Sequence, residues 1–117
     1  MQYWLTIDAL DLRLEVDNEG FLLDPADWSP ELAVELARLE EIALGDQHWA
    51  VVNFVRDEFE TNEVVPAARH VLRMLKAQFG EAHASRKALY QLFPYGYGQQ
   101  ACKIAGMRKP LKLMLDV

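Results

Sequence analysis

The residue best suited to chemistry is Cys102, the only cysteine of the chain. It lies in Gln99-Gln-Ala-Cys-Lys-Ile-Ala105, which we expect to form a short helix closed by Gly106 in a left-handed C-cap. The positive end of such a helix and the ammonium of Lys103 would both favour thiolate over thiol. The pattern therefore predicts a reactive thiol near the C-terminus.

A second interpretation of Cys102 is open, because a free cysteine often behaves as a small buried apolar side chain with an inert thiol. Other chemistry has little support. The three histidines His48, His70 and His83 do not combine with the cysteine in a zinc-binding spacing, so no metal site is expected. The sequence has no Ser/His/Asp arrangement and no phosphate-binding loop, and we expect no cofactor.

The composition is that of an ordinary folded protein. The 117 residues suffice for one domain, expected over 1–117, with a core that needs no covalent staples. The chain is 51% apolar and 26% charged, and no apolar run approaches the length of a membrane span. A single cysteine excludes an internal disulfide. Because the N-terminus also lacks a secretory signal, we expect a cytoplasmic protein without membrane insertion.

Charge is distributed unevenly along the chain. Residues 1–84 carry 6 Lys and Arg against 17 Asp and Glu, whereas residues 85–117 carry 6 against 1. The basic C-terminal third could meet an acidic protein, a nucleic acid or an anionic substrate. It could equally dock against the acidic body of the same chain. Its cations are Arg86, Lys87, Lys103, Arg108, Lys109 and Lys112.

A small β-hairpin is predicted near the N-terminus. Residues 12–16 alternate apolar and polar side chains, which is the period of a half-buried strand. Residues 17–20 supply turn-forming types, and the apolar run 21–23 follows them. An isolated hairpin is marginally stable in water, so we expect this one to lie on the helices.

Five helices are predicted from 3.6-residue apolar periodicity and from their end signals. Ser29 is a capping hydroxyl, Pro30 suits the first turn, and Glu31 complements the helix dipole. Gly45 is expected to end this first helix. The five are expected over 30–45, 47–62, 66–80, 85–93 and around Cys102, so the fold class is mainly α.

Several short motifs, in their order and spacing, resemble the DsrC/TusE family of sulfur-relay proteins. The most specific is Gln100-Ala-Cys-Lys-Ile-Ala-Gly106, followed by Lys109-Pro110. The resemblance runs from residue 20 to residue 110. Its earlier pieces are Gly20-Phe-Leu-Leu-Asp24, Trp28, His48-Trp49, Arg56, Phe59, Pro66, Arg69 and Leu92-Phe-Pro94.

This resemblance implies both a fold and a function. The fold would be a small orthogonal helical bundle with the N-terminal hairpin, a helix-turn-helix-like C-terminal half and a C-terminal arm at 107–117. Members of the family carry persulfide sulfur on a cysteine of that arm. The implied donor is a TusBCD- or DsrEFH-like complex. The implied acceptor is a thiolase acting in tRNA 2-thiouridine synthesis, or a sulfite-reductase-like enzyme of dissimilatory sulfur metabolism.

The chain departs from the family at the arm. The principal sulfur-carrying cysteine of the family is the penultimate residue, eleven positions after the one that Cys102 matches, and here Leu113 stands in its place. The chain thus resembles a divergent member, and whether it is an enzyme is left open. In one hypothesis Cys102 carries sulfur alone, as a sulfurtransferase-like carrier, with Lys103 as electrostatic support and Arg108 and Lys109 holding the arm or a partner. In the other, the chain is a non-catalytic regulatory or binding paralogue that engages relay partners or nucleic acid.

Overall fold

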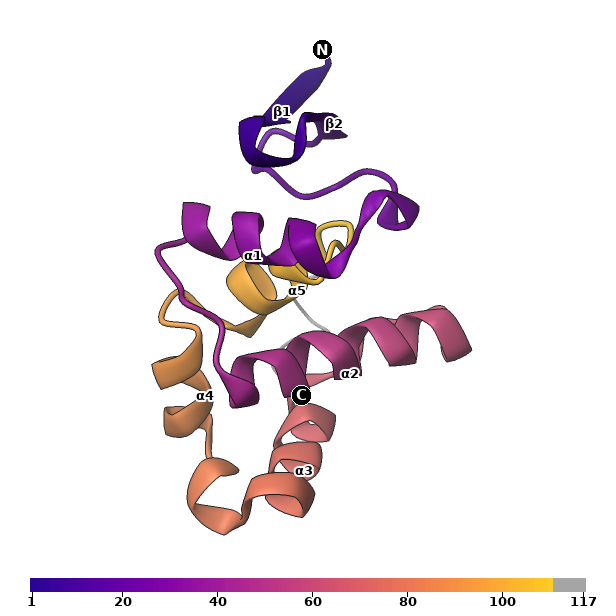
Figure 1. Cartoon of the computed structure of the whole chain (residues 1–117). Coiled ribbons are helices and arrows are strands. Elements are labelled where there is room, and N and C mark those ends of the chain that lie inside the picture. Colours follow the sequence, from indigo (N-terminus) through magenta and orange to yellow (C-terminus); the bar gives the residue numbers. More distant parts are fainter. Residues whose placement is uncertain (111–117) are drawn as a thin grey trace.

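The structure is a computed structural model that describes residues 1–110. At the N-terminus, β1 (Tyr3–Ile7) and β2 (Leu12–Val16) form a two-stranded antiparallel sheet in which Leu5 faces Leu14 (Figure 1). A single turn of 3₁₀-helix, Asp8–Leu10, connects the strands. An N-terminal hairpin is therefore confirmed.

The partner of β2 differs from the prediction. Sequence patterning paired 12–16 with 21–23, but the second segment contributes only an isolated bridge between Val16 and Leu22. The intervening turn is the reason. One carboxylate oxygen of Asp17, Oδ1, accepts the amides of Glu19 and Phe21 at 2.8 and 3.0 Å. The chain then enters the body of the protein instead of extending a ladder, and Phe21 is fully buried.

The first helix, α1 (Pro30–Leu39), begins as predicted and ends earlier. The Ser29 hydroxyl accepts the amide of Leu32 at 3.1 Å, which satisfies one of the unpaired donors of the first turn. The predicted end at Gly45 is wrong. The backbone of Glu41 adopts a left-handed conformation with φ of 60°, and this stops the helix within two residues of Leu39.

Gly45 instead precedes α2 (Asp46–Asn62) as its N-cap. Its amide donates to Nδ1 of His48 at 3.1 Å, so a histidine side chain of the first turn reaches back and satisfies the N-cap amide. Nε2 of the same ring lies 3.0 Å from the carbonyl oxygen of Leu92. The second helix is thereby tied to the C-terminal half of the chain at its first turn.

The C-terminal half follows the predicted order of short helices. α3 (Ala68–Phe79) and α4 (Arg86–Leu92) flank a 3₁₀ turn at Glu81–His83, and the Ser85 hydroxyl accepts the amide of Ala88 at the start of α4. A single π-helical turn, Tyr97–Ala101, then leads into the three-residue α5 (Cys102–Ile104).

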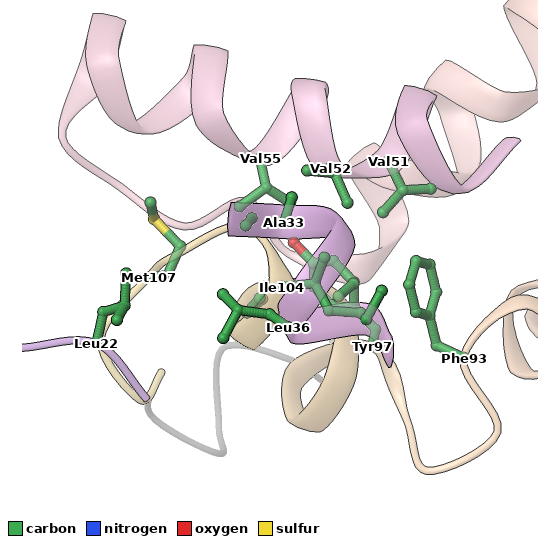
Figure 2. Packing of buried hydrophobic residues seen from close by; sticks show 14 of the residues in the cluster. Leu22, Ala33, Leu36, Val51, Val52, Val55, Phe93, Tyr97, Ile104 and Met107 are labelled. Carbon is green, nitrogen blue, oxygen red and sulfur yellow. The ribbon is translucent and has the colours of Figure 1, made fainter. Parts of the chain in front are cut away.

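Helix α2 runs through the centre of the molecule. Figure 1 shows α1 and α5 on one side of it, α3 on the other and α4 beside its N-terminal end, with the hairpin beyond α1. Three valines of α2 meet side chains from α1, α5 and the Tyr97 turn in one buried cluster (Figure 2). Figure 2 labels ten members of this cluster: Leu22, Ala33, Leu36, Val51, Val52, Val55, Phe93, Tyr97, Ile104 and Met107. The mainly helical fold class is confirmed.

Candidate functional site

Cys102 lies at the start of α5 and is completely buried. Its amide donates to the carbonyl oxygen of Tyr97 across the π-helical turn. Its carbonyl oxygen accepts the amide of Met107 at 3.0 Å, while the amide of Gly106 bonds to Lys103. These last two bonds form a Schellman motif around Gly106, whose φ of 75° confirms the predicted left-handed C-cap. Both backbone groups of Cys102 are thus fixed by local structure.

The environment of the thiol opposes ionisation. Burial raises the pKa of Cys102 to about 12, and the nearby Tyr97 hydroxyl offsets only part of that rise. Desolvation of the buried sulfur disfavours the charged thiolate, so the neutral form is favoured. The prediction of a thiolate-favouring site is wrong for this conformation, because sequence spacing placed the cysteine near a helix start without showing how deeply that start is buried.

The ammonium of Lys103, which was predicted to support the Cys102 thiolate, lies over an aromatic ring. Its Nζ lies 4.9 Å from the centre of the Phe21 ring, a cation–π contact with the segment that follows the hairpin. Adjacent residues of a helix point in different directions, so a neighbour in sequence need not be a neighbour in space. The structure describes the contact of Lys103 with Phe21, and the electrostatic support of Cys102 by Lys103 stays a prediction.

Tyr97 is the polar neighbour of Cys102 that sequence patterning missed. The ring is nearly buried, and its hydroxyl donates a 2.7 Å hydrogen bond to the carbonyl oxygen of Pro66. Burial, and secondarily the interaction with Cys102, raise the pKa of Tyr97 above its ordinary value. A signal was present in the sequence: a large aromatic residue stands between Gly96 and Gly98, where turn chemistry alone asks for small residues.

A second missed feature fixes the far end of α5. The indole N–H of Trp28 donates to the carbonyl oxygen of Ile104 at 2.8 Å. The guanidinium of Arg56 stacks 4.6 Å over the indole and donates to the carbonyl oxygens of Pro25 and Ala105 at 2.9 and 3.3 Å. We call Trp28 and Arg56 the indole–guanidinium clamp. Trp28 and Arg56 are both among the motifs of the resemblance, but the sequence alone could not show that they bind a helix end.

The remaining basic residues of the predicted site lie at the surface. Arg108 is exposed, and Lys109 forms an ion pair with Glu19 of the turn after β2, which raises the pKa of Lys109. For Lys109 the structure thus shows the contact with the acidic body of the same chain. Lys112 and Leu113, and with them most of the expected arm, lie outside the described residues.

Two further properties of residues 1–110 bear on function. Within this part of the chain, no three His, Cys, Asp or Glu side chains are grouped so that they could hold a metal ion. None of its helices combines the length and the apolar character needed to cross a bilayer.

Comparison with known proteins gives consistent results. The family described as "DsrC like protein" matches residues 9–114. Sulfurtransferase TusE of Escherichia coli O6:H1 is 44% identical over 100 residues, covering 86% of this chain and 92% of the relative. The TusE of Buchnera aphidicola subsp. Schizaphis graminum is 38% identical over 102 residues, covering 87% and 90%.

Solved structures agree with the sequence relatives. The NMR structure of Allochromatium vinosum DsrC matches with a TM-score of 0.80 and 34% identity, covering 95% of this chain and 97% of that one. The oxidized γ-subunit of the dissimilatory sulfite reductase (DsrC) from Archaeoglobus fulgidus matches with a TM-score of 0.82 and 31% identity, covering 93% and 97%. Sequence and fold together show that the chain belongs to the family of DsrC-like proteins.

Proposed function

We propose that this protein is a sulfur-relay component that accepts persulfide sulfur on Cys102 and hands it on to a partner. The observation that carries the proposal is the similarity to sulfurtransferase TusE over 86% of the chain. Cys102 is the only thiol of the protein, so it is the only residue on which a persulfide can form. The carrier hypothesis is therefore preferred to a purely regulatory role.

The reaction on Cys102 is a thiol exchange. The Cys102 sulfur attacks the outer, sulfane sulfur of a donor persulfide, the new S–S bond forms as the donor S–S bond breaks, and the electron pair and a proton return to the donor thiol. No net oxidation or reduction occurs. The reverse reaction with an acceptor thiol or enzyme discharges the carrier.

The buried position of Cys102 sets a condition on this chemistry. With a pKa of about 12, on the order of one thiol in 10⁵ is ionised at neutral pH in the closed conformation. A donor also has no access to a fully buried sulfur atom. Loading therefore requires a transient opening around Cys102, and the closed conformation protects the persulfide from water and from unrelated thiols.

The proposed relay partners rest on the resemblance to TusE and DsrC proteins. We propose a donor of the TusBCD or DsrEFH type and an acceptor that is either a tRNA-thiolating enzyme or an enzyme related to sulfite reductase, all meeting the protein in the cytoplasm. The TusE relatives favour the tRNA-thiolating acceptor, because they share the higher sequence identity. Exposed Arg108 is the cation of the predicted site best placed to meet an acidic partner surface.

Intact-protein mass spectrometry after incubation with a persulfide donor tests the proposal. We expect wild type to gain one sulfur atom that a reductant removes, and Cys102→Ser to gain none. Circular dichroism of both proteins serves as the folding control. A folded wild type that gains no sulfur, or a Cys102→Ser variant that gains as much as wild type, would overturn the carrier role.

A further inference from the structure

An open groove of about 650 Å³ lies between α2 and α3, the two helices that Figure 1 shows next to each other. Its floor is apolar, and is made by Phe54 of α2, Val64 and Val65 of the connecting loop, and Met74 of α3. Val64 is 46% exposed, and the other three are only partly buried. An apolar surface left open in this way gains free energy when a partner covers it.

The lining residues of α3 have the spacing of one helical face. Four of them, at positions i, i+3, i+4 and i+7, are His70, Arg73, Met74 and Ala77. They form a stripe that extends over two turns, a length of about 11 Å. A groove between two helices with this spacing is the surface onto which a third helix packs. The shape therefore favours a helical occupant.

The charge of the groove is an exception in an acidic part of the chain. Residues 1–84 carry 17 Asp and Glu against 6 Lys and Arg. Four of these six cations have a described partner, an aromatic ring for the first and a carboxylate for the others: Arg13, Arg38, Arg56 and Lys76. Within residues 1–110 the structure gives no such partner to the other two, Arg69 and Arg73. Both are exposed and both line the groove, so its edge carries a local positive charge.

The spacing of the two arginines specifies what would pair with them. Arg69 and Arg73 are four residues apart on α3, so their Cβ atoms are about 5–6 Å from each other. Two carboxylates at positions i and i+4 of a partner helix have the same separation, and the planar guanidinium group binds carboxylates with two hydrogen bonds. Helix α3 contains no Asp or Glu of its own. The matching carboxylates must therefore come from elsewhere.

Two other occupants fit the groove less well. A nucleic acid would bring its phosphates close to Glu58, which lines the groove from α2, and its backbone would gain nothing from an apolar floor. A second copy of the chain would bring a net charge of −6 against the same net charge, which opposes association. An acidic helix with an apolar stripe agrees with both the floor and the edge.

We propose that the α2–α3 groove binds an amphipathic helix of a partner protein. The apolar side chains of that helix lie on the floor, and two of its carboxylates, one turn apart, bind Arg69 and Arg73. Phenylalanine, methionine and arginine, which line the groove, are enriched at protein interfaces. The inference goes beyond the proposed function, because Cys102 does not line the groove and binding there involves no sulfur transfer.

A designed peptide serves as the probe. It has about 20 residues and a fluorescein label, with leucines at i, i+3, i+4 and i+7 and two glutamates four residues apart at the edge of that stripe. A second peptide has the same composition in a scrambled order, so that its leucines share no face. Fluorescence anisotropy measures the Kd of each for the full-length protein. We expect the amphipathic peptide to bind about tenfold more tightly than the scrambled one.

Charge exchange tests the contact with the two arginines. For Arg69→Glu combined with Arg73→Glu, we expect the affinity for the glutamate peptide to fall about tenfold, and the affinity for a lysine version of it to rise by a similar factor. Arg86→Glu combined with Lys87→Glu is the matched control, because it makes the same charge change at exposed residues of α4 outside the groove. The control should leave both affinities within about twofold of wild type. Circular dichroism shows whether each variant is folded, and the single variant Arg73→Gln, expected to bind about threefold more weakly, decides if the double variant is not.

Several results would overturn the proposal. They are no peptide binding up to about 1 mM, equal binding of the ordered and scrambled peptides, and equal losses in the two double variants. Sedimentation equilibrium and binding of a DNA duplex are measured in parallel. A dimer or a duplex complex that only the Arg69 and Arg73 substitutions abolish would assign the groove to a second copy or to a nucleic acid instead. Sulfur loading of Cys102 is measured on the same variants and should be unchanged, so a failure of docking and a failure of the carrier role are separate results.

Discussion

The indole N–H of Trp28 donates to the carbonyl oxygen of Ile104 at 2.8 Å, across a separation of 76 residues in the chain. Ile104 is the last residue of α5, and the carbonyls at a helix end lack partners within the helix. This bond, together with Arg56 stacked on the indole, fixes the end of the Cys102 helix. At the other end the carbonyl oxygen of Tyr97 accepts the amide of Cys102, so backbone and side-chain contacts fix the candidate sulfur carrier on both sides.

Replacing Trp28 by phenylalanine should weaken the clamp while keeping most of the ring. The variant leaves the carbonyl of Ile104 without its donor, and we expect the unfolding free energy to fall by about 1–3 kcal/mol. Urea denaturation measures the change. Trp4→Phe is the matched control, because Trp4 is 46% exposed and should change stability by less than about 0.5 kcal/mol. Equal losses in the two variants would contradict the clamp.

Gly106→Ala should lower the free energy of unfolding more than Gly80→Ala does, although both glycines have positive φ, 75° at Gly106 and 93° at Gly80. A Cβ at residue 106 would lie 2.6 to 2.8 Å from atoms of Trp28, whereas one at residue 80 meets nothing within 4 Å. Strain should cost about 1–3 kcal/mol in each case, with about 1–3 kcal/mol more from overlap at residue 106 alone. Thermal or urea unfolding gives both values. If the two variants lost similar amounts of unfolding free energy, the Trp28 indole would have to move aside without cost.

The buried thiol makes stability depend on alkaline pH. Unfolding returns the pKa of Cys102 from about 12 to its ordinary value of 9.0, so the unfolded chain releases its proton first. The stabilising contribution is complete below about pH 9 and declines between 9 and 12, by up to about 1.4 kcal/mol per pH unit.

The measurement is the difference in unfolding free energy between wild type and Cys102→Ala, followed from neutral pH to about pH 11. Subtraction removes the part of the Tyr97 contribution that comes from burial, the main cause of the raised pKa of Tyr97. We expect a constant difference up to about pH 8 and then a decline in favour of the alanine variant. A flat difference over the whole range would show that the thiol is not sequestered.

The parts of the fold that depend on local chemistry were predictable from sequence. Ser29 was expected as a helix cap and a helix was expected over 85–93, and the hydroxyls of Ser29 and Ser85 accept backbone amides at the starts of these two helices. Gly106 was expected as a left-handed C-cap and has that conformation. In each case the signal and its effect lie within a few residues, so no knowledge of tertiary packing is needed.

The parts that depend on distant contacts were not predictable in the same way. Gly45 is a plausible helix terminator, but it became an N-cap because His48 reaches back to its amide. Cys102 and Lys103 are adjacent in sequence, yet the thiol is buried in the core and the ammonium lies over Phe21. Burial of the cysteine depends on α1 and α2, and no local pattern around residue 102 records it.

Complete transfer of sulfur through the protein is the most direct test of the relay. Radiolabelled sulfur is loaded from a persulfide donor, the donor is removed, and a thiol acceptor is added to folded wild type and Cys102→Ser. We predict that the label binds wild type through a reducible bond, leaves it for the acceptor, and fails to bind the serine variant. Label that binds both proteins equally, or that never leaves wild type, would contradict the account of Cys102 as a relay cysteine.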